Sequence, residues 1–571
     1  MADYNSKEWW NPQIVKAIEW RETCSKETVR EKIRMYYQNR YPEAENMEPT
    51  FNLIFMIASS MIPSLVYQRP GIINTPRRPE FAFWAKFFDA VDGWLVDEME
   101  LKSVIQSAVL YAFLDNVCAI KVGYDVGEIK GQEMVFDDIP GVHDRVRKTN
   151  QPWLDVIPAD RFIVAPGTKN TRNCRWYAEE LTFPTESVKQ FDGFKGVEAT
   201  GAVSEKKRGK FENKWVNFLS KEEKWTTYWE IHEQEKGTIS AIDRNGKQIM
   251  SPRPDIAQVD GLGMEILSFN QGLDGVWGTS DSEYILSQMI EGNESRRDGR
   301  LQRKNAVSKI LVDSEVMTEE EEEQLTTGEP HTAIRIAVPP DKKLTDVATV
   351  FQPHVQLEFF EYDKKLIHDA QLITGMGPNQ FGNFNPGRRT KGEAQIVEEN
   401  SHLRIGFRRE KVGDAISNLM SRVNQIVTKN WTAEVVQQVV GVEGALHWVK
   451  ARPAELDNIR AQLTTRVNIE SLRPVSSERR KSELVELLGV LSKFPEQQID
   501  VSPIIQGFVS MFDSIEVGKV LPSAGPNVLE AQEFQKAQAL AAQDPNLGQQ
   551  LQQNLGGLGR LVNGLPQGGS K

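Results

Sequence analysis

Cysteine is scarce in this chain: only Cys24, Cys118 and Cys174 occur among 571 residues, and they stand far apart. An odd number of cysteines at wide spacing gives no disulfide framework, and no CxxC pair is present to hold a metal. The cysteine content is therefore typical of a protein made for a reducing compartment.

Long apolar runs are also missing. The longest, Leu53 to Val66, is interrupted by Ser59, Ser60 and Pro63. It is shorter than the roughly 20 residues that a membrane-spanning helix needs, so we expect a buried helix and no contact with a membrane. The N-terminal residues MADYNSKEWWNPQ have no apolar core preceded by positive charge, so we expect no signal peptide.

Positive charge is in the minority. The chain has 68 Lys and Arg against 80 Asp and Glu, a net charge of −12. This balance argues against a general nucleic-acid coat protein and a membrane-surface protein, so any contact with nucleic acid must be local. With 39% hydrophobic and 26% charged residues the chain can bury a core, and its length suggests roughly three or four folding units.

Enzyme motifs are not found. The sequence has no GxxxxGK[ST] phosphate loop, GxSxG elbow or EF-hand loop, and His232-Glu233 lacks the second histidine of an HExxH zinc site. Carboxylate pairs such as Asp97-Glu98 and Asp137-Asp138 are typical of a solvated surface. We therefore predict no catalytic residue, no metal and no cofactor.

The order of segments predicts an α+β, mainly helical protein. Residues 8–124 read mainly as helices, and short β-branched and aromatic runs then indicate strands of an antiparallel or mixed sheet. These runs are CAIKVGYD from Cys118, WLDVIP from Trp153, FIVAP from Phe162, RWYAEELTF from Arg175 and WTTYWEIHE from Trp225.

Helical signals return at Ser280, where SDSE fits a capping box and predicts one helix to about Asn305. Its first half has an apolar stripe, whereas residues 291–305 contain one large apolar residue, Leu301. Because the second half can bury little by itself, it must lie in water or against a polar partner.

The next segments alternate between short strands, helices and a loop. SKILV and TAIRIAV read as strands around the acidic segment Glu319 to Glu323, and a helix is expected from about Gln356 to Ile373. Residues 376–389 are rich in Gly, Asn and Pro and predict a loop. TKGE then opens a helix to about Trp431, roughly 60 Å long at 1.5 Å per residue.

This order resembles that of the portal proteins of tailed bacteriophages, the rings at one capsid vertex through which DNA is packaged and ejected. CAIKVGYD and PWLDVIPADRFIVAPGTKNTRNCRWYAEE resemble the portal wing, and WGTSDSEYILSQMIEGNESRR resembles the start of the first stem helix. TGMGPNQFGNFNPGRRTKGEAQIVEENSHLR resembles the end of the second stem helix, the tunnel loop and the start of the spine helix. Lys391-Gly392 departs from the family's Thr-Ala-x-Glu pattern and leaves that helix start uncertain by a few residues.

The resemblance implies a portal fold with a mixed β wing, a helical stem, a small α/β clip and a helical crown. Its implied boundaries are wing 1–279, first stem helix 280–305, clip 306–355, second stem helix 356–375, tunnel loop 376–389, spine helix and wing return 390–475, crown 476–522, and a partly disordered tail 523–571.

The resemblance also implies a homo-oligomeric ring, usually of twelve copies, at the unique vertex of a virion and made in the host cytoplasm. The implied partners are double-stranded viral DNA bound without sequence specificity, the terminase large subunit, a head-tail adaptor, and the major capsid and scaffolding proteins. A motif-poor enzyme such as a nuclease, and another oligomeric virion scaffold or adaptor, remain as alternatives.

The candidate channel residues are basic side chains in the first stem helix, and polar, basic and aromatic side chains in the tunnel loop. In the stem they are Arg296, Arg297, Arg300, Arg303 and Lys304, several of which share one helix face. In the loop they are Asn379, Gln380, Phe381, Asn383, Phe384, Arg388 and Arg389, with glycines that allow movement. The stem residues have a second interpretation, pairing between subunits with Glu291, Glu294 and Asp298, and the loop could equally be an ordinary solvent loop.

The acidic segment is the candidate contact between the clip and changing partners. It consists of Glu319, Glu320, Glu321, Glu322 and Glu323, and charge complementarity favours fast, exchangeable contacts. The alternative is a solvated helix start, because MTEEEEEQL places acidic residues in a first turn.

Overall fold

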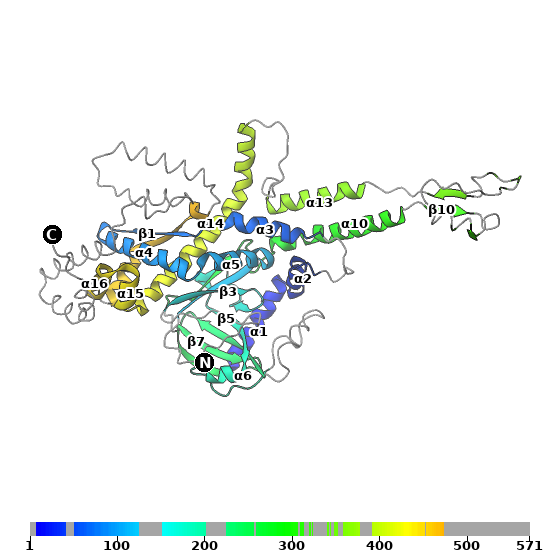
Figure 1. Ribbon diagram of the computed structural model, residues 1–571. Helices are drawn as coiled ribbons and strands as arrows, with labels where there is room; N and C mark the ends of the chain where they lie inside the picture. The colour runs from blue at the N-terminus through cyan, green and yellow to red at the C-terminus, as the bar shows by residue number, and fades with distance from the viewer. Residues whose placement is uncertain are drawn as a thin grey trace, which may run out of the picture.

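The computed structural model describes residues 7–40, 51–124, 151–200, 224–255, 259–273, 275–306, 309–312, 348–351, 358–376, 391–451 and 453–472, with residues 319, 320, 323, 338, 340, 341 and 343 (Figure 1). Within these ranges we find no helix with the length and apolarity that crossing a bilayer requires. The chain folds into a mixed α+β body from which two helices project, as Figure 1 shows.

A long helix runs through the body. This helix, α14 (Lys391–Asn430), packs against α3 (Leu53–Leu65), α4 (Ala82–Glu98) and α5 (Leu101–Asp115). It buries one apolar face at alternating four- and three-residue spacing, which consists of Val412, Ile416, Leu419, Val423 and Ile426. Each fully buried aliphatic side chain contributes about 1.5–3 kcal/mol, so burial holds this part of α14 in place. Its N-terminal part stands clear of the body (Figure 1).

A two-stranded antiparallel sheet joins distant parts of the chain. Strand β1 (Gly71–Pro76) pairs with β12 (Leu463–Asn468), with Asn74 opposite Thr465. The sheet packs on α4 and α14. It therefore ties a segment near the start of the described sequence to one near its end.

Two further antiparallel sheets form the rest of the body. One has the order β3-β2-β9, with strands β2 (Val117–Tyr124), β3 (Pro152–Pro158) and β9 (Met264–Ser268). The other has the order β4-β5-β6-β7-β8, with strands β4 (Phe162–Val164), β5 (Trp176–Pro184), β6 (Trp225–Glu233), β7 (Thr238–Asp243) and β8 (Gln248–Pro254). Helix α1 (Lys7–Cys24) packs on the five-stranded sheet, where Trp10 meets Trp176 edge to face at 5.4 Å between ring centroids.

Buried charges join these two sheets. Lys121 of β2 places its Nζ 2.9 Å from Glu179 Oε2 of β5 and 2.7 Å from Glu230 Oε1 of β6. His232 lies 3.0 Å from the same Glu230 oxygen and 3.7 Å from Asp255. Burial alone would lower the pKa of Lys121, but the two carboxylates hold it well above the usual value. Lys121 is therefore the cation that ties the two sheets together.

The remaining described helices surround this body. They are α2 (Glu27–Tyr37), α6 (Thr185–Gln190), α15 (Ala433–Val440), α16 (Val442–Lys450) and α17 (Pro453–Ala461), with short 3-10 turns at Pro79–Phe81, Thr171–Asn173 and Ile469–Leu472.

Most of the predicted elements are present. Strands β2 to β6 cover the five predicted β runs, α3 is the predicted buried helix, and α14 is the predicted long helix, starting at Lys391 despite Gly392. The helical interpretation of residues 8–124 is wrong for β1, a six-residue strand. The prediction of one sheet is also incomplete, because the strands divide between two sheets.

Several predictions fall outside the described residues. The crown 476–522, the tail 523–571 and residues 377–389 of the predicted loop lie there. The strand TAIRIAV lies there too, except for its last residue, Val338. These predictions stay predictions.

Candidate functional site: the projecting helix pair and its junction with the body

The first projecting helix begins after a short helical turn. Ser280 Oγ accepts a hydrogen bond from Glu283 N at 3.0 Å, as the capping signature predicts. The predicted single helix 280–305 is nevertheless divided into α9 (Asp281–Tyr284) and α10 (Leu286–Asn305). Ser282 Oγ donates to Phe113 O at 2.9 Å and Ile285 is fully buried, so packing against α5 fixes the break.

Helix α13 (Glu358–Thr374) runs beside α10, and the two project together from the body (Figure 1). Gly292 of α10 makes room for this contact, because an added Cβ would lie 2.8 Å from the Phe51 ring and 3.6 Å from Leu366 of α13. Arg296 spans the pair: its Nε donates to Asp363 Oδ2 at 2.9 Å, and its guanidinium lies 4.4 Å from the centre of the Phe51 ring. The polar half of α10 therefore has the polar partner that its sequence requires.

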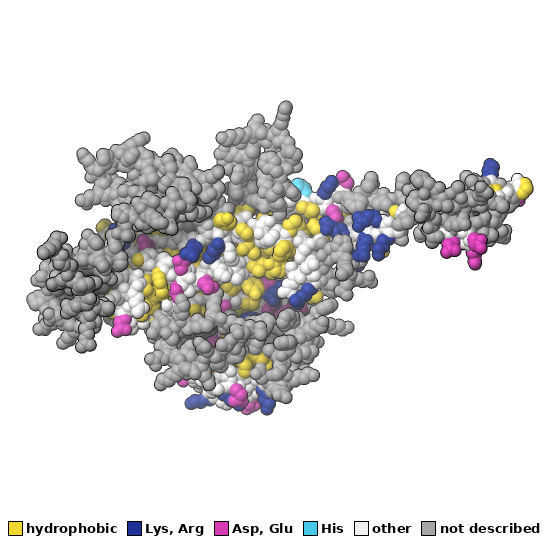
Figure 2. All heavy atoms as spheres, in the orientation of Figure 1, with side chains coloured by type: hydrophobic (Ala, Val, Ile, Leu, Met, Phe, Trp, Pro, Cys, Tyr) yellow, Lys and Arg dark blue, Asp and Glu magenta, His cyan; other side chains and the backbone are white. Residues whose placement is uncertain are grey.

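The other basic residues of α10 lie on the outside of the pair. Arg297, Arg303 and Lys304 are exposed, and Arg300 is half-buried. Figure 2 shows Lys and Arg side chains gathered over the outer half of α10. Four of the five predicted stem residues thus form one basic surface, whereas Arg296 also serves to hold α13.

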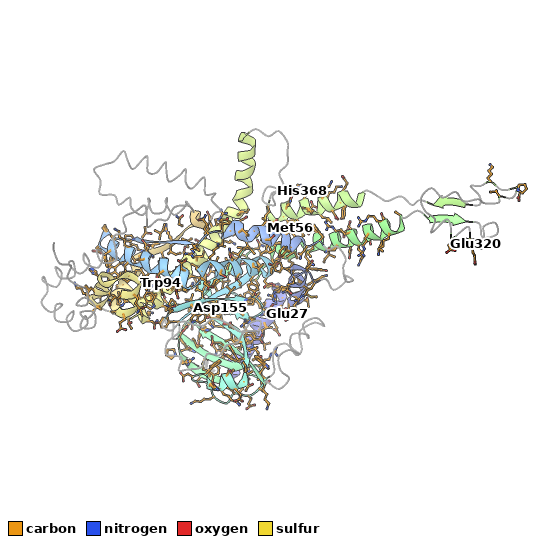
Figure 3. The ribbon with its side chains drawn as sticks, viewed as in Figure 1. Glu27, Met56, Trp94, Asp155, Glu320 and His368 are labelled. Carbon is orange, nitrogen blue, oxygen red and sulfur yellow. The ribbon has the colours of Figure 1, made fainter. Side chains whose placement is uncertain are left out.

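A short two-stranded sheet lies at the far end of the pair. Strand β10 (Lys309–Val312) is antiparallel to β11 (Ala348–Phe351), and only the first of the two was predicted. Glu319, Glu320 and Glu323 are exposed, and Glu320 lies at the tip, far from the body (Figure 3). Glu321 and Glu322 lie outside the described residues, so the predicted acidic segment is placed in part.

The first residue of the predicted tunnel loop has fixed neighbours. Gly375 adopts a left-handed φ of 73° and its N–H donates to Gln371 O at 2.8 Å, which ends α13. Met376, the first residue of the loop, is buried. The loop candidates Asn379, Gln380, Phe381, Asn383, Phe384, Arg388 and Arg389 lie outside the described residues.

Arg408 of α14 joins the projecting pair to the body. Its Nη1 donates to Thr374 O, at the end of α13, at 3.0 Å, and its Nη2 lies 2.8 Å from Asp281 Oδ2 of α9. Asn270 Nδ2 donates to the other Asp281 oxygen at 3.0 Å. Both Arg408 and Asp281 are buried. One guanidinium therefore connects both stem segments to the long helix beside the start of the loop.

Two further basic residues of α14 bind main-chain carbonyls nearby. Arg409 donates to Ser64 O near the end of α3, and Lys411 Nζ donates to Phe269 O at 2.8 Å and Ser268 O at 3.3 Å after β9. Burial, together with Arg408, lowers the pKa of Lys411. These residues were not predicted, because RREK in a long helix is typical of a solvated face. The only feature of the sequence that could have indicated their burial is their position in an otherwise apolar part of the helix.

Across the described ranges, no group of three His, Cys, Asp or Glu residues is arranged to hold a metal ion. Cys118 and Cys174 are buried thiols, and burial raises the pKa of Cys174 to about 11. His232, near the end of β6, is buried in the charge cluster between the sheets.

No protein-family model matches the chain, and no curated protein matches it. Among solved structures, a chain from the neck of an empty gene transfer agent (GTA) particle, computed with C6 symmetry, is similar at 12% identity. The match covers 73% of this chain and 90% of that chain with a TM-score of 0.35. A chain from the virion of a native GTA particle matches at 11% identity, covering 69% and 86%, with a TM-score of 0.32. Because both TM-scores are below 0.5, neither similarity establishes that this protein shares a fold with the matched chain.

Proposed function

We propose that this chain is a portal-type subunit whose copies form a ring around a passage for double-stranded DNA. The observation that carries the proposal is the projecting α10–α13 pair, with a basic surface on α10 and acidic residues at its tip. The order of the chain's segments, which resembles that of portal proteins, supports the same function. In this proposal the acidic tip binds a packaging terminase and later a tail adaptor.

The charges suit a passage better than a tight binding site. Each phosphate that Lys or Arg neutralises releases counterions and adds affinity, so a strongly basic lining would hold DNA in place. A chain with a net charge of −12 and a local basic surface on α10 provides weak contacts that repeat around a ring. DNA can then slide without dissociating from the ring.

The ring itself is tested by light scattering after size exclusion, with negative-stain imaging. We expect a particle near twelve times the 64.7 kDa subunit, with a central hole that the α10–α13 pairs and residues 376–389 face. A catalytically active monomer would support the enzyme alternative instead. A map that places residues 376–389 on the outer rim would contradict the proposal.

The basic surface is tested by the triple variant Arg297→Gln, Arg303→Gln, Lys304→Gln. We expect rings that still form but bind duplex DNA more weakly at low salt, with a smaller slope of log affinity against log salt. The slope falls because fewer phosphates are neutralised. The measurement is fluorescence anisotropy of a labelled duplex from about 50 to 200 mM salt, a range in which such contacts change affinity strongly.

The matched control removes the same charge elsewhere. Lys169, Arg172 and Arg175 are also exposed, and they lie near the five-stranded sheet. Their replacement by Gln should leave the salt slope unchanged. Rings that fall apart in the α10 variant, with no separate effect on the slope, would favour pairing between subunits with Glu291, Glu294 and Asp298.

A further inference from the structure

Asp92 is a buried carboxyl group with no cation beside it. It lies on α4 with none of its surface exposed, and within the described ranges no ion pair involves it. Four other buried carboxylates of the described residues face a cation: Asp115 with Arg34, Glu179 with Lys121, Glu265 with Arg422, and Asp281 with Arg408. A fifth, Asp243, instead accepts a hydrogen bond from the backbone N–H of Lys247 at 2.6 Å. Burying an ionised carboxylate without such a partner is costly, so Asp92 needs another explanation.

Hydrogen bonds from two elements, β1 and α14, converge on this group. Asn74 of β1 donates from Nδ2 to Asp92 Oδ2 at 2.7 Å, and Asn424 of α14 donates from Nδ2 to the same oxygen at 3.3 Å. Asn74 is itself fixed, because its N–H donates to Asp89 Oδ1 at 2.7 Å and its Oδ1 accepts from Thr465 Oγ1 of β12 at 2.6 Å. Asp92 thus lies where α4, the β1–β12 sheet and α14 meet.

Among the residues that the structure describes, two oxygens in this cluster have no donor. Asp92 Oδ1 and Asn424 Oδ1 are both buried without a hydrogen-bond partner, and they belong to side chains that already touch through Asn424 Nδ2. Two acceptors cannot satisfy each other. A proton on the carboxyl group supplies the missing donor, since a protonated Asp has one O–H group.

We propose that Asp92 is a neutral acid in the folded protein and that its proton, shared with Asn424, latches the long helix α14 to α4 and the β1–β12 sheet. The charged group that acts on Asp92 from its own helix is Asp89, and the groups that face it from β1 and α14 are the amides Asn74 and Asn424. Burial is the largest cause and raises the pKa of Asp92 to about 7; the hydrogen bonds from the two amides act in the opposite direction, and Asp89 makes the smallest contribution, also upward.

The pH dependence follows from the different pKa of Asp92 in the folded protein and in a locally opened state, in which this carboxyl group is exposed to water. The folded protein keeps the proton up to about pH 7, whereas an exposed Asp in the opened state releases it near pH 3.8. Opening is therefore accompanied by loss of one proton between these values, so the junction weakens as pH rises through that window and changes no further above it. For one proton the opening equilibrium rises about tenfold per pH unit.

The test is hydrogen exchange of the native full-length protein at pH 5, 6, 7 and 8, with rates corrected for intrinsic exchange. Protection of amides near residues 418–430 should fall about tenfold per pH unit from pH 5 to about 7 and then level off. In Asp92→Asn, which keeps an acceptor for Asn74 and gains a permanent donor, protection should be flat with pH. The control Asp97→Asn removes an exposed acid on the same helix and should keep the wild-type slope.

A second readout detects the proton on the carboxyl group in the wild-type protein itself. The wild-type infrared spectrum should contain a protonated-carboxyl band that is present at pH 6, decreases as pH rises through 7, and is missing in Asp92→Asn. A pH-independent wild-type protection, a slope that survives in Asp92→Asn, or no such band would each overturn the proposal.

Discussion

Replacing Arg408 by Met should lower the free energy of unfolding of the region around the projecting pair by about 3–5 kcal/mol, because it leaves a buried charge without its partner. Asp281 would keep only the hydrogen bond from Asn270, and Thr374 O would lose its donor. Arg408→Lys should recover only part of the loss, since an ammonium group cannot reproduce the planar two-sided contact of a guanidinium group.

The measurement is urea unfolding combined with hydrogen exchange of residues 266–290 and 366–376. We expect both segments to lose protection together, since Arg408 binds both. Arg466→Met, at an exposed position on β12, is the control and should change stability by no more than about 0.5 kcal/mol. Loss of protection in only one segment would show that Arg408 does not connect them.

Lys121→Met should have an effect of similar size, about 3–5 kcal/mol, on the junction between the β3-β2-β9 sheet and the five-stranded sheet. Glu179 and Glu230 would then face each other in a buried site without the ammonium group that lies 2.9 Å from one and 2.7 Å from the other. Burial acts to raise the pKa of Glu230, and Lys121 and His232 are what hold it far below the usual value. Without Lys121, Glu230 should take up a proton more readily, so the loss of stability should shrink as pH falls.

This pH signature separates lost charge pairing from lost packing. The triple variant Lys121→Met, Glu179→Gln, Glu230→Gln should recover much of the stability, because it removes the unpaired charges along with the cation. Lys189→Met breaks an exposed pair with Glu186 and should cost about 0–1 kcal/mol. If Lys121→Met lowers the free energy of unfolding by the same amount at pH 5 and pH 8, the electrostatic explanation is contradicted.

Local patterns predicted the elements that bury one regular face. Val412, Ile416 and Leu419 repeat at helical spacing, and the strands β3 to β6 have aromatic and β-branched residues between turn residues, so their type could be read directly. Strand β1 could not be read this way. It is short, has Gly and Pro at its ends, and depends on a partner near residue 465.

The candidate site, like the fold, could be predicted only in part. The basic residues of α10 were predictable from their spacing, but the pairing of Arg296 with Asp363 depends on how α13 returns along α10. Arg408 and Asp92 look like solvent-facing charges in the sequence. Their burial comes from contacts with segments far away along the chain, which no local pattern encodes.

The β1–β12 pairing also sets when the subunit can fold on the ribosome. Thr465 and Asn74 are 391 positions apart, so at about 5–20 residues per second the first strand waits roughly 20–80 s for its partner to be translated. During that interval the apolar side of α4 has no finished sheet beside it. Proteins that shelter nascent chains would therefore have their main task in this period, before the second strand leaves the ribosome.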